Sequence, residues 1–291
     1  MKKKMLLSLF VVLSLFIIAG CDSSKDSKDK DDDTVISSRS KKNKLSKVNI
    51  EETVILDKED VKVTAKSISY DSRGEINIKL LIENNSDENI TLQTRNFTIN
   101  DLLVDEYLSV DVAAGKKAND VITIFEEDLK KSNIETIKDI EFDMYAFETK
   151  SYDDLFEENG IKLTTDAKKY KQSYDVDGEL IVDEEDVKIY YLNTKSDKDL
   201  GGINVNIFVE NNTDKQITIT AEDVSVNGFM IDPVFIIDIP AGKKAYDALY
   251  FYDDELEKND IDKIKELELK FVAETSKNYK ELFTTDKLTI K

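Results

Sequence analysis

The stretch "INIKLLIENN" (residues 76–85) decides the fold class of this chain. Every second residue of its first part is aliphatic: Ile76, Ile78, Leu80 and Ile82. A period of two is typical of a β-strand with one buried face, and the Asn-Asn pair that follows is a turn signal. The pattern returns as "INVNIFVENN" (residues 203–212). The sequence therefore predicts the same strand and the same turn twice.

The similarity between the two halves of the chain extends well beyond this strand. "ILDKEDVKV" (residues 55–63) matches "IVDEEDVKI" (residues 181–189), and residues 74–163 align with residues 201–290 without a gap. The motif "AGKKA" falls at the same place in both copies. We therefore predict a first repeat at residues 52–164 and a second repeat at residues 179–291, joined by a polar linker at residues 165–178.

Short alternating strands separated by turn signals recur along both repeats. This spacing predicts an all-β fold of two tandem immunoglobulin-like antiparallel β-sandwiches, and without the Cys–Trp–Cys pattern of antibody domains we expect no disulfide. One segment breaks the alternation in each repeat, "EEDLKKSNI" (residues 126–134) and "DDELEKNDI" (residues 253–261). Acids at its start and lysine near its end favour one short helix per repeat.

The N-terminus has the layout of a secretory signal peptide. Three lysines precede an uncharged run at residues 5–19, which is short for a membrane span of about 20 residues. The run ends in Ile18, Ala19, Gly20 and Cys21, the only cysteine of the chain. This quartet resembles the bacterial lipobox, which implies a cleaved signal peptide at residues 1–20 and lipidation of Cys21. An ordinary signal peptide or a signal anchor with an incidental thiol is the alternative.

The residues after Cys21 are polar and highly charged. Residues 21–51 hold too little apolar surface to offset the entropy of ordering, so we expect a lipidated, disordered tether. Its acidic run "KDSKDKDDD" (residues 25–33) lacks the glycine turn and ligand spacing of a calcium loop, and we interpret it as a spacer.

Composition excludes several functions. The net charge is −20, and removal of residues 1–20, with three lysines and no acid, makes it −23. Such a surface repels nucleic acid, so we expect no nucleic-acid partner. Histidine is absent, which excludes histidine-based catalysis and the common zinc sites. Because nothing singles out one pair among the 61 acidic residues, we predict no enzyme, no cofactor and no metal site.

Two repeated motifs have competing interpretations. "AGKK" (residues 114–117 and 241–244) is a basic spot that suits an anionic polymer, or a hairpin turn whose glycine supplies a positive φ and whose lysines protect a sheet edge. "ENN" (residues 83–85 and 210–212) offers an Asn-x-Ser/Thr glycosylation acceptor, or a turn. We favour the turn for both, because two copies of one fold require the same turn.

The second repeat differs from the first in its aromatic residues and its prolines. Pro233 and Pro240, the only prolines of the chain, bracket "VFIIDI" (residues 234–239). Because proline lacks a donor, this strand is expected at an edge that is presented to a partner, or that is protected from aggregation. The candidate partner-binding residues are Pro233, Phe235, Pro240, Tyr246, Tyr250 and Tyr252. Repacking of the core is the alternative account of the aromatic residues.

A lipobox, a Ser/Lys/Asp tether and tandem sandwiches with an "AGKK" turn resemble surface lipoproteins of low-GC Gram-positive bacteria. This resemblance covers nearly the whole chain, with the lipobox as its specific part. It implies a non-catalytic lipoprotein, anchored on the extracytoplasmic face of the cell membrane, that binds an envelope or extracellular protein or glycan. The alternative is a lipoprotein that captures a solute or cation for a transporter, as the negative charge suggests.

Overall fold

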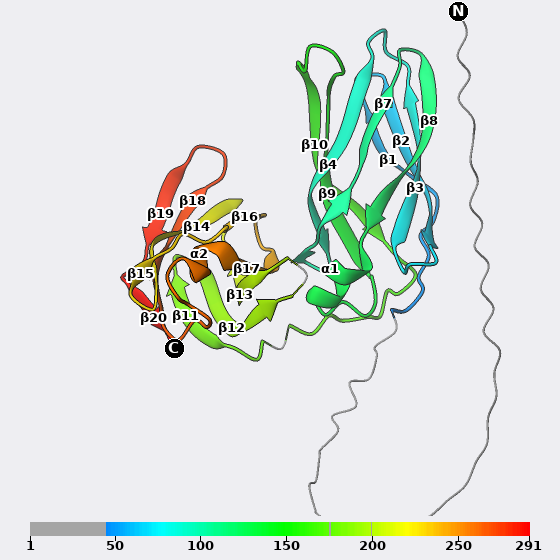
Figure 1. Cartoon of the computed structure of the whole chain (residues 1–291). Helices are drawn as coiled ribbons and strands as arrows, with labels where there is room; N and C mark the ends of the chain where they lie inside the picture. Colours follow the sequence, from blue (N-terminus) through cyan, green and yellow to red (C-terminus); the bar gives the residue numbers. More distant parts are fainter. Residues whose placement is uncertain (1–44, 175, 199) are drawn as a thin grey trace, which may run out of the picture. The chain divides into compact units, whose positions relative to one another are not determined.

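The computed structural model describes residues 45–174, 176–198 and 200–291 (Figure 1). The predicted signal peptide, Cys21 with its lipobox and most of the predicted tether lie outside these residues. Within the described ranges, no helix is both long enough and apolar enough to cross a membrane.

The first repeat is built from two antiparallel layers. One sheet has the order β1-β2-β3-β8-β6. Its strands are β1 (Thr53–Lys58), β2 (Val61–Tyr70), β3 (Ile76–Asn84), β8 (Lys116–Ile124) and β6 (Glu106–Tyr107). The facing layer joins β10 to β9, β9 to β4, and β4 to both β5 and β7. These strands are β4 (Ile90–Ile99), β5 (Leu102–Leu103), β7 (Ser109–Val112), β9 (Asp139–Glu148) and β10 (Asp154–Thr164).

The second repeat has the same connectivity. Its first layer has the order β17-β13-β12-β11, and its second layer places β15, β16 and β18 against β14, with β19 and β20 against β18. The first layer contains β11 (Glu179–Glu184), β12 (Val187–Asp197), β13 (Gly202–Asn211) and β17 (Lys244–Tyr252). The second contains β14 (Ile217–Val226), β15 (Phe229–Met230), β16 (Ile236–Ile239), β18 (Leu267–Thr275), β19 (Lys280–Thr284) and β20 (Leu288–Ile290).

Each repeat carries one short helix, as predicted. These are α1 (Glu126–Lys131) and α2 (Asp253–Glu257), both with three acids in the first turn. Leu129 and Leu256 are the buried residues of these helices. The acids favour the start of each helix through its dipole, and the leucine holds it against the sandwich.

The alternating residues form two hydrophobic cores. Ile76, Ile78, Leu80 and Ile82 are almost fully buried in the first, and Val205, Ile207 and Val209 are fully buried in the second. Each such side chain contributes about 1.5–3 kcal/mol when it leaves water. The all-β, sandwich-type fold predicted from the period of two is thus confirmed.

The end of the predicted tether belongs to the first repeat. Val48 is 2 % exposed and packs in the first core, where its N–H donates to Tyr70 Oη at 2.8 Å. The N–H of Asn49 donates to Asp166 Oδ1 at 3.0 Å. The folded region therefore begins earlier than residue 52. Residues 45–51 are held by these tertiary contacts rather than by a strand ladder, so they carry no alternating pattern.

The "AGKK" turn is not a hairpin. In the first repeat it connects β7, which pairs with β4, to β8, which pairs with β3 in the other sheet. In the second repeat it connects β16 to β17, again in different sheets. Gly115 and Gly242 have φ values of 65° and 69°, so the expected positive φ is present. The turn therefore crosses between the two layers of each sandwich.

Strand pairing also joins the two repeats, which lie within one compact unit. β5 of the first repeat pairs in parallel with the start of β17, where Leu102 faces Lys244. Phe208 of β13 is fully buried in the first core, flanked by the rings of Tyr190 and Tyr246. The linker contributes Tyr174, whose hydroxyl donates to Asn100 O at 2.6 Å.

Candidate functional site

The asparagine of each "ENN" motif that was weighed as a glycosylation acceptor is buried and fixes the turn. Asn84 is fully buried; its Nδ2 donates to Glu88 O at 2.8 Å and to Val112 O at 2.9 Å, and its Oδ1 accepts from Ser86. Asn211 makes the corresponding bonds to Lys215 O and Ile239 O. An amide held in this way is not accessible as an acceptor, so its role is to tie the β3–β4 and β13–β14 turns to the opposite layer.

The strand between the two prolines lies at a sheet edge. Within the described residues, β16 pairs with one strand, β14, from Ile217↔Ile239 to Thr220↔Ile236. Pro233 and Pro240 lie just outside β16, and Val234 makes an isolated bridge to Tyr250. The prolines therefore stand before and after the edge strand. Because β14 is the one partner strand of β16 among the described residues, the other side of β16 has no strand paired with it.

Exposed apolar side chains gather next to this strand. Met230 is 68 % exposed, Ile236 is 67 %, Val234 is 55 % and Phe229 is 47 %. We call these four residues the exposed edge. They stand within a few positions of one another in β15, β16 and the connection between them. Several large apolar side chains exposed close together in the sequence of a folded domain indicate an interaction surface.

The structure distributes the six predicted partner-binding residues over several places. Phe235 is half-buried, with its ring 6.0 Å from that of Phe271 in the second core. Tyr246 packs 4.6 Å from Phe208 and contacts the first core. Tyr250 donates its hydroxyl to Gly201 O at 2.9 Å. Tyr252 is half-exposed beside Tyr250. The prolines thus adjoin the exposed edge, whereas Phe235 and Tyr246 are mainly packing residues.

None of the four residues of the exposed edge is among the six predicted partner-binding residues, although Val234 and Ile236 belong to the stretch between the prolines that was expected at an edge. A signal was present in the alignment of the repeats. Ile236 stands where the first repeat has Ser109, an outward position of β7. An isoleucine at an outward position of a strand has no core to fill, which indicates a surface contact.

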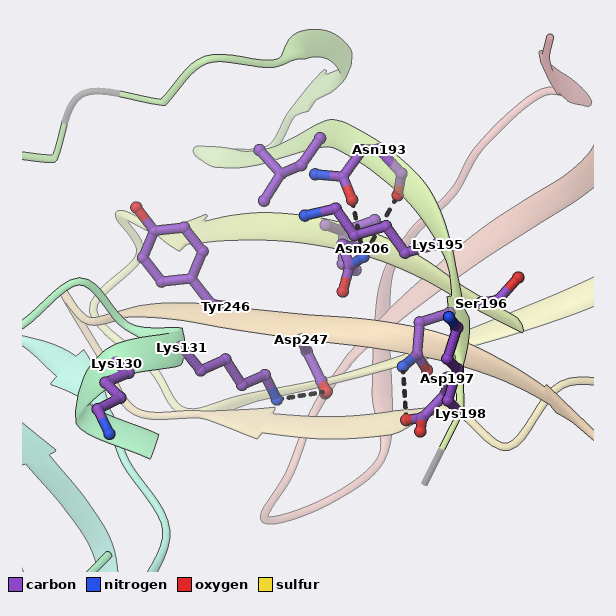
Figure 2. Close-up of a pocket in the computed structure, with 13 residues that line it drawn as sticks. Lys130, Lys131, Asn193, Lys195, Ser196, Asp197, Lys198, Asn206, Tyr246 and Asp247 are labelled. Atoms are coloured by element: carbon purple, nitrogen blue, oxygen red, sulfur yellow. Dashed lines mark hydrogen bonds and ion pairs between the residues drawn. The ribbon is translucent and has the colours of Figure 1, made fainter. Parts of the chain in front are cut away.

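A second feature is a pocket of about 660 Å³ beside β12, β13 and β17 (Figure 2). We call it the lysine pocket, after its four lysines: Lys130, Lys131, Lys195 and Lys198. Asn206 Nδ2 donates to Asn193 Oδ1 at 3.0 Å, and Asn204 Nδ2 donates to Asp197 Oδ2 at 3.1 Å. Amides and ammonium groups therefore supply much of the polar part of the wall, and Leu192, Ile207 and Tyr246 contribute apolar surface.

The charges of this pocket are only partly neutralised. Lys130 pairs with Glu126 at 2.5 Å and Lys131 pairs with Asp247 at 3.7 Å. Lys195 and Lys198 form no ion pair with any other residue that the structure describes. On a protein with a net charge of −20, such a site suits an anionic or hydroxyl-rich molecule better than an apolar one.

A smaller cavity of about 220 Å³ lies next to β16 and is acidic. Burial raises the pKa of Asp128 to about 6; Asp105 adds to the rise and Lys131 opposes it. Burial also raises the pKa of Asp247, against the effect of Lys131. Nevertheless, no group of three or more carboxylates within the described residues is arranged to hold a metal ion.

No protein-family model and no curated protein matches this sequence.

Proposed function

We propose that this protein is a non-catalytic binding protein of the cell surface, anchored to the membrane through Cys21, that engages a protein partner at the exposed edge. The observation that supports the proposal is the exposure of Phe229, Met230, Val234 and Ile236 on β15, on β16 and on the connection between them, with β16 itself between Pro233 and Pro240.

The physical argument rests on two properties of this edge. The unpaired main chain of β16 can accept another strand, and strand addition is a common way in which sandwiches bind protein. The four apolar side chains supply area whose burial stabilises a complex at about 25 cal/mol per Å² before the costs of association. Proline at each end restricts pairing to a short segment, which favours one specific partner over general aggregation.

The anchor follows from the N-terminal sequence. In a lipobox formed by Ile18, Ala19 and Gly20, Cys21 becomes the new N-terminus and carries the lipid. Two acyl chains provide stable anchoring where one chain is marginal. The folded repeats then stand on the extracytoplasmic side, where an envelope or extracellular protein or glycan is accessible to them.

The test is binding of the purified mature chain, made with Cys21→Ala so that it stays in solution, to washed cell envelopes. We expect saturable binding that falls at least about tenfold, or about 1.4 kcal/mol, in the double variant Met230→Asp, Ile236→Asp. Tyr279→Asp is the matched control, because Tyr279 is 75 % exposed in the same repeat but away from β15 and β16. Equal binding by all three proteins would exclude this edge as the binding surface.

The second candidate is a lipoprotein that captures a solute for a transporter, which the lysine pocket favours. Inorganic phosphate is a suitable probe of an anion site, and calcium of a cation site. Stoichiometric phosphate binding in calorimetry that is lost in the variant Lys195→Gln, Lys198→Gln would support this candidate. Stoichiometric calcium binding would support its cation form. Weak and diffuse uptake of both ions would count against it.

A further inference from the structure

The contact between the two repeats has a defined donor and acceptor. The turn at residues 100–103 is the segment that inserts, and we call it the donor turn. The start of β17 receives it, and we call it the acceptor. These names describe the inserted and the receiving segment and not the direction of a hydrogen bond. The N–H of Lys244 donates to Asp101 O at 2.9 Å, and Leu102 pairs with Lys244. The ammonium of Lys243 contacts Asp101 at 2.7 Å and Glu141 at 2.8 Å. We call this arrangement the internal contact.

The second repeat contains the same donor turn at residues 227–230. Asn100 and Asn227 both have a φ of 51°. Asn100 Oδ1 accepts from the N–H groups of residues 138 and 139, and Asn227 Oδ1 accepts from those of residues 265 and 266. Leu102 is 1 % exposed, whereas its counterpart Phe229 is 47 % exposed. The second donor turn therefore has the geometry of the first, but no other part of the described chain buries Phe229 as the second repeat buries Leu102.

The first repeat contains the same acceptor at the start of β8. Lys116 and Lys117 stand where the second repeat has Lys243 and Lys244. Both are exposed, whereas the side chain of Lys243 is only 12 % exposed. β8 pairs with β3 along its length, but on its other side it pairs only with β6, at Thr123 and Ile124, among the described residues. The second edge of β8 is thus open at Lys117.

We propose that copies of this chain associate head to tail, with the donor turn at residues 227–230 of one copy on the start of β8 of the next. In this contact Phe229 faces Lys117, as Leu102 faces Lys244 within the chain. The inference rests on the proposed function, because it names a second copy as the partner of one end of the exposed edge, the part formed by Phe229 and Met230. Since donor and acceptor are different surfaces, the contact is heterologous and builds open chains, or rings where the rotation between copies closes.

The association is weaker than the internal contact. Gly228 replaces Asp101, so one carboxylate for the lysine is missing. Glu268 takes the place of Glu141, but it already pairs with Lys287 at 3.1 Å. The first repeat also has Leu81 and Asn119 in place of the stacked Phe208 and Tyr246. We therefore expect dissociation constants on the order of 100 µM in solution, in the range of weak transient contacts.

Sedimentation velocity tests the proposal on the mature Cys21→Ala chain at about 5 to 500 µM, a range that brackets this dissociation constant. We expect the weight-average sedimentation coefficient to rise with concentration. A donor variant, Phe229→Asp with Met230→Asp, and an acceptor variant, Lys116→Glu with Lys117→Glu, should each remain monomeric. Tyr279→Asp should associate like the wild type. Unchanged thermal unfolding identifies the variants that remain folded.

Mixing the two variants gives the decisive result. Each retains one intact surface, so an equimolar mixture should form a dimer that does not grow further, because both of its outer ends are blocked. Association that needs only one of the two surfaces, or a mixture that stays monomeric, would overturn the head-to-tail contact. Monomers at every concentration, together with edge-dependent binding to cell envelopes, would overturn this inference while leaving the proposed function in place.

Discussion

The ammonium of Lys243, in the second repeat, lies 2.7 Å from Asp101 Oδ1, in the first. Glu141 accepts a further bond from the same group at 2.8 Å. Burial by itself lowers the pKa of Lys243, but its bonds to both carboxylates outweigh burial and raise that pKa. The charge is thus held between the repeats by partners from a distant part of the sequence.

Replacement of Lys243 by Met should destabilise the protein markedly. The change removes the cation of Asp101 and leaves Glu141 with Lys162 alone, at 3.4 Å, so we expect the free energy of unfolding to fall by about 2 kcal/mol. Lys116→Met is the matched control, because Lys116 is the exposed equivalent in the first repeat; its effect should stay within about 0.5 kcal/mol. Urea unfolding of the mature chain measures both. Equal effects would show that the pair contributes nothing to stability.

The buried amides of Asn84 and Asn211 should be equally important in their own repeats. Asn84→Ala removes the donors to Glu88 O and Val112 O, which leaves the buried Val112 carbonyl without this bond. We expect a loss of about 2–4 kcal/mol from the free energy of unfolding. Asn211→Ala should cost a similar amount, since its bonds are of the same kind.

The neighbouring asparagines provide the controls for this prediction. Asn85 and Asn212 are exposed, so replacement of either by Ala should change stability by less than about 0.5 kcal/mol. Urea unfolding again supplies the measurement. If Asn85→Ala were as costly as Asn84→Ala, the effect would come from the turn sequence in general rather than from the buried amide.

The strands could be predicted because their signal is local. Ile76, Ile78, Leu80 and Ile82 alternate in the sequence, and the same alternation places them on one buried face of β3. The leucine between acids and lysines likewise marked both short helices. Repetition added a second copy of each signal, so the fold class followed from the sequence.

Strand partners could not be predicted in the same way, because pairing depends on distant residues. The "AGKK" turn needs a glycine with positive φ whether it joins two neighbouring strands or crosses between layers. The local sequence is therefore the same for a hairpin and for the observed crossing. Leu102 and Phe229 occupy equivalent positions, yet one is buried by the other repeat and one is exposed. Burial of this kind is decided by what the rest of the chain places beside a residue.

Asp128 makes stability depend on pH. Its pKa is raised by burial to about 6, whereas an aspartate in an unfolded chain has a pKa of about 3.9. The folded state therefore binds this proton more tightly. The resulting stabilisation is fully present below about pH 4 and is lost as the pH rises through about 6. Asp128→Asn should thus stabilise the protein at pH 7.5, by up to about 1 kcal/mol because the group is partly exposed and screened.

The pH dependence separates this effect from a general change in charge. The advantage of Asp128→Asn over the wild type should shrink to nearly zero by about pH 4, where the native carboxyl is already protonated. Glu127→Gln removes the same charge from an exposed position of α1 and should show no such trend. Urea unfolding at several pH values measures the difference. A constant advantage at all pH values would contradict the assigned cause.

Replacement of Cys21 by Ala tests the anchor on which the proposed surface role depends. Without the thiol there is no atom to accept the lipid, so the chain should remain an unprocessed precursor or leave the cells for the medium. Labelling with a fatty-acid analogue, followed by fractionation, measures lipid attachment and membrane retention together. Ser24→Ala alters a small residue just beyond the lipobox and should be labelled and retained like the wild type. If the processed Cys21→Ala chain stayed fully in the membrane fraction, something other than a lipid on Cys21 would hold the protein there.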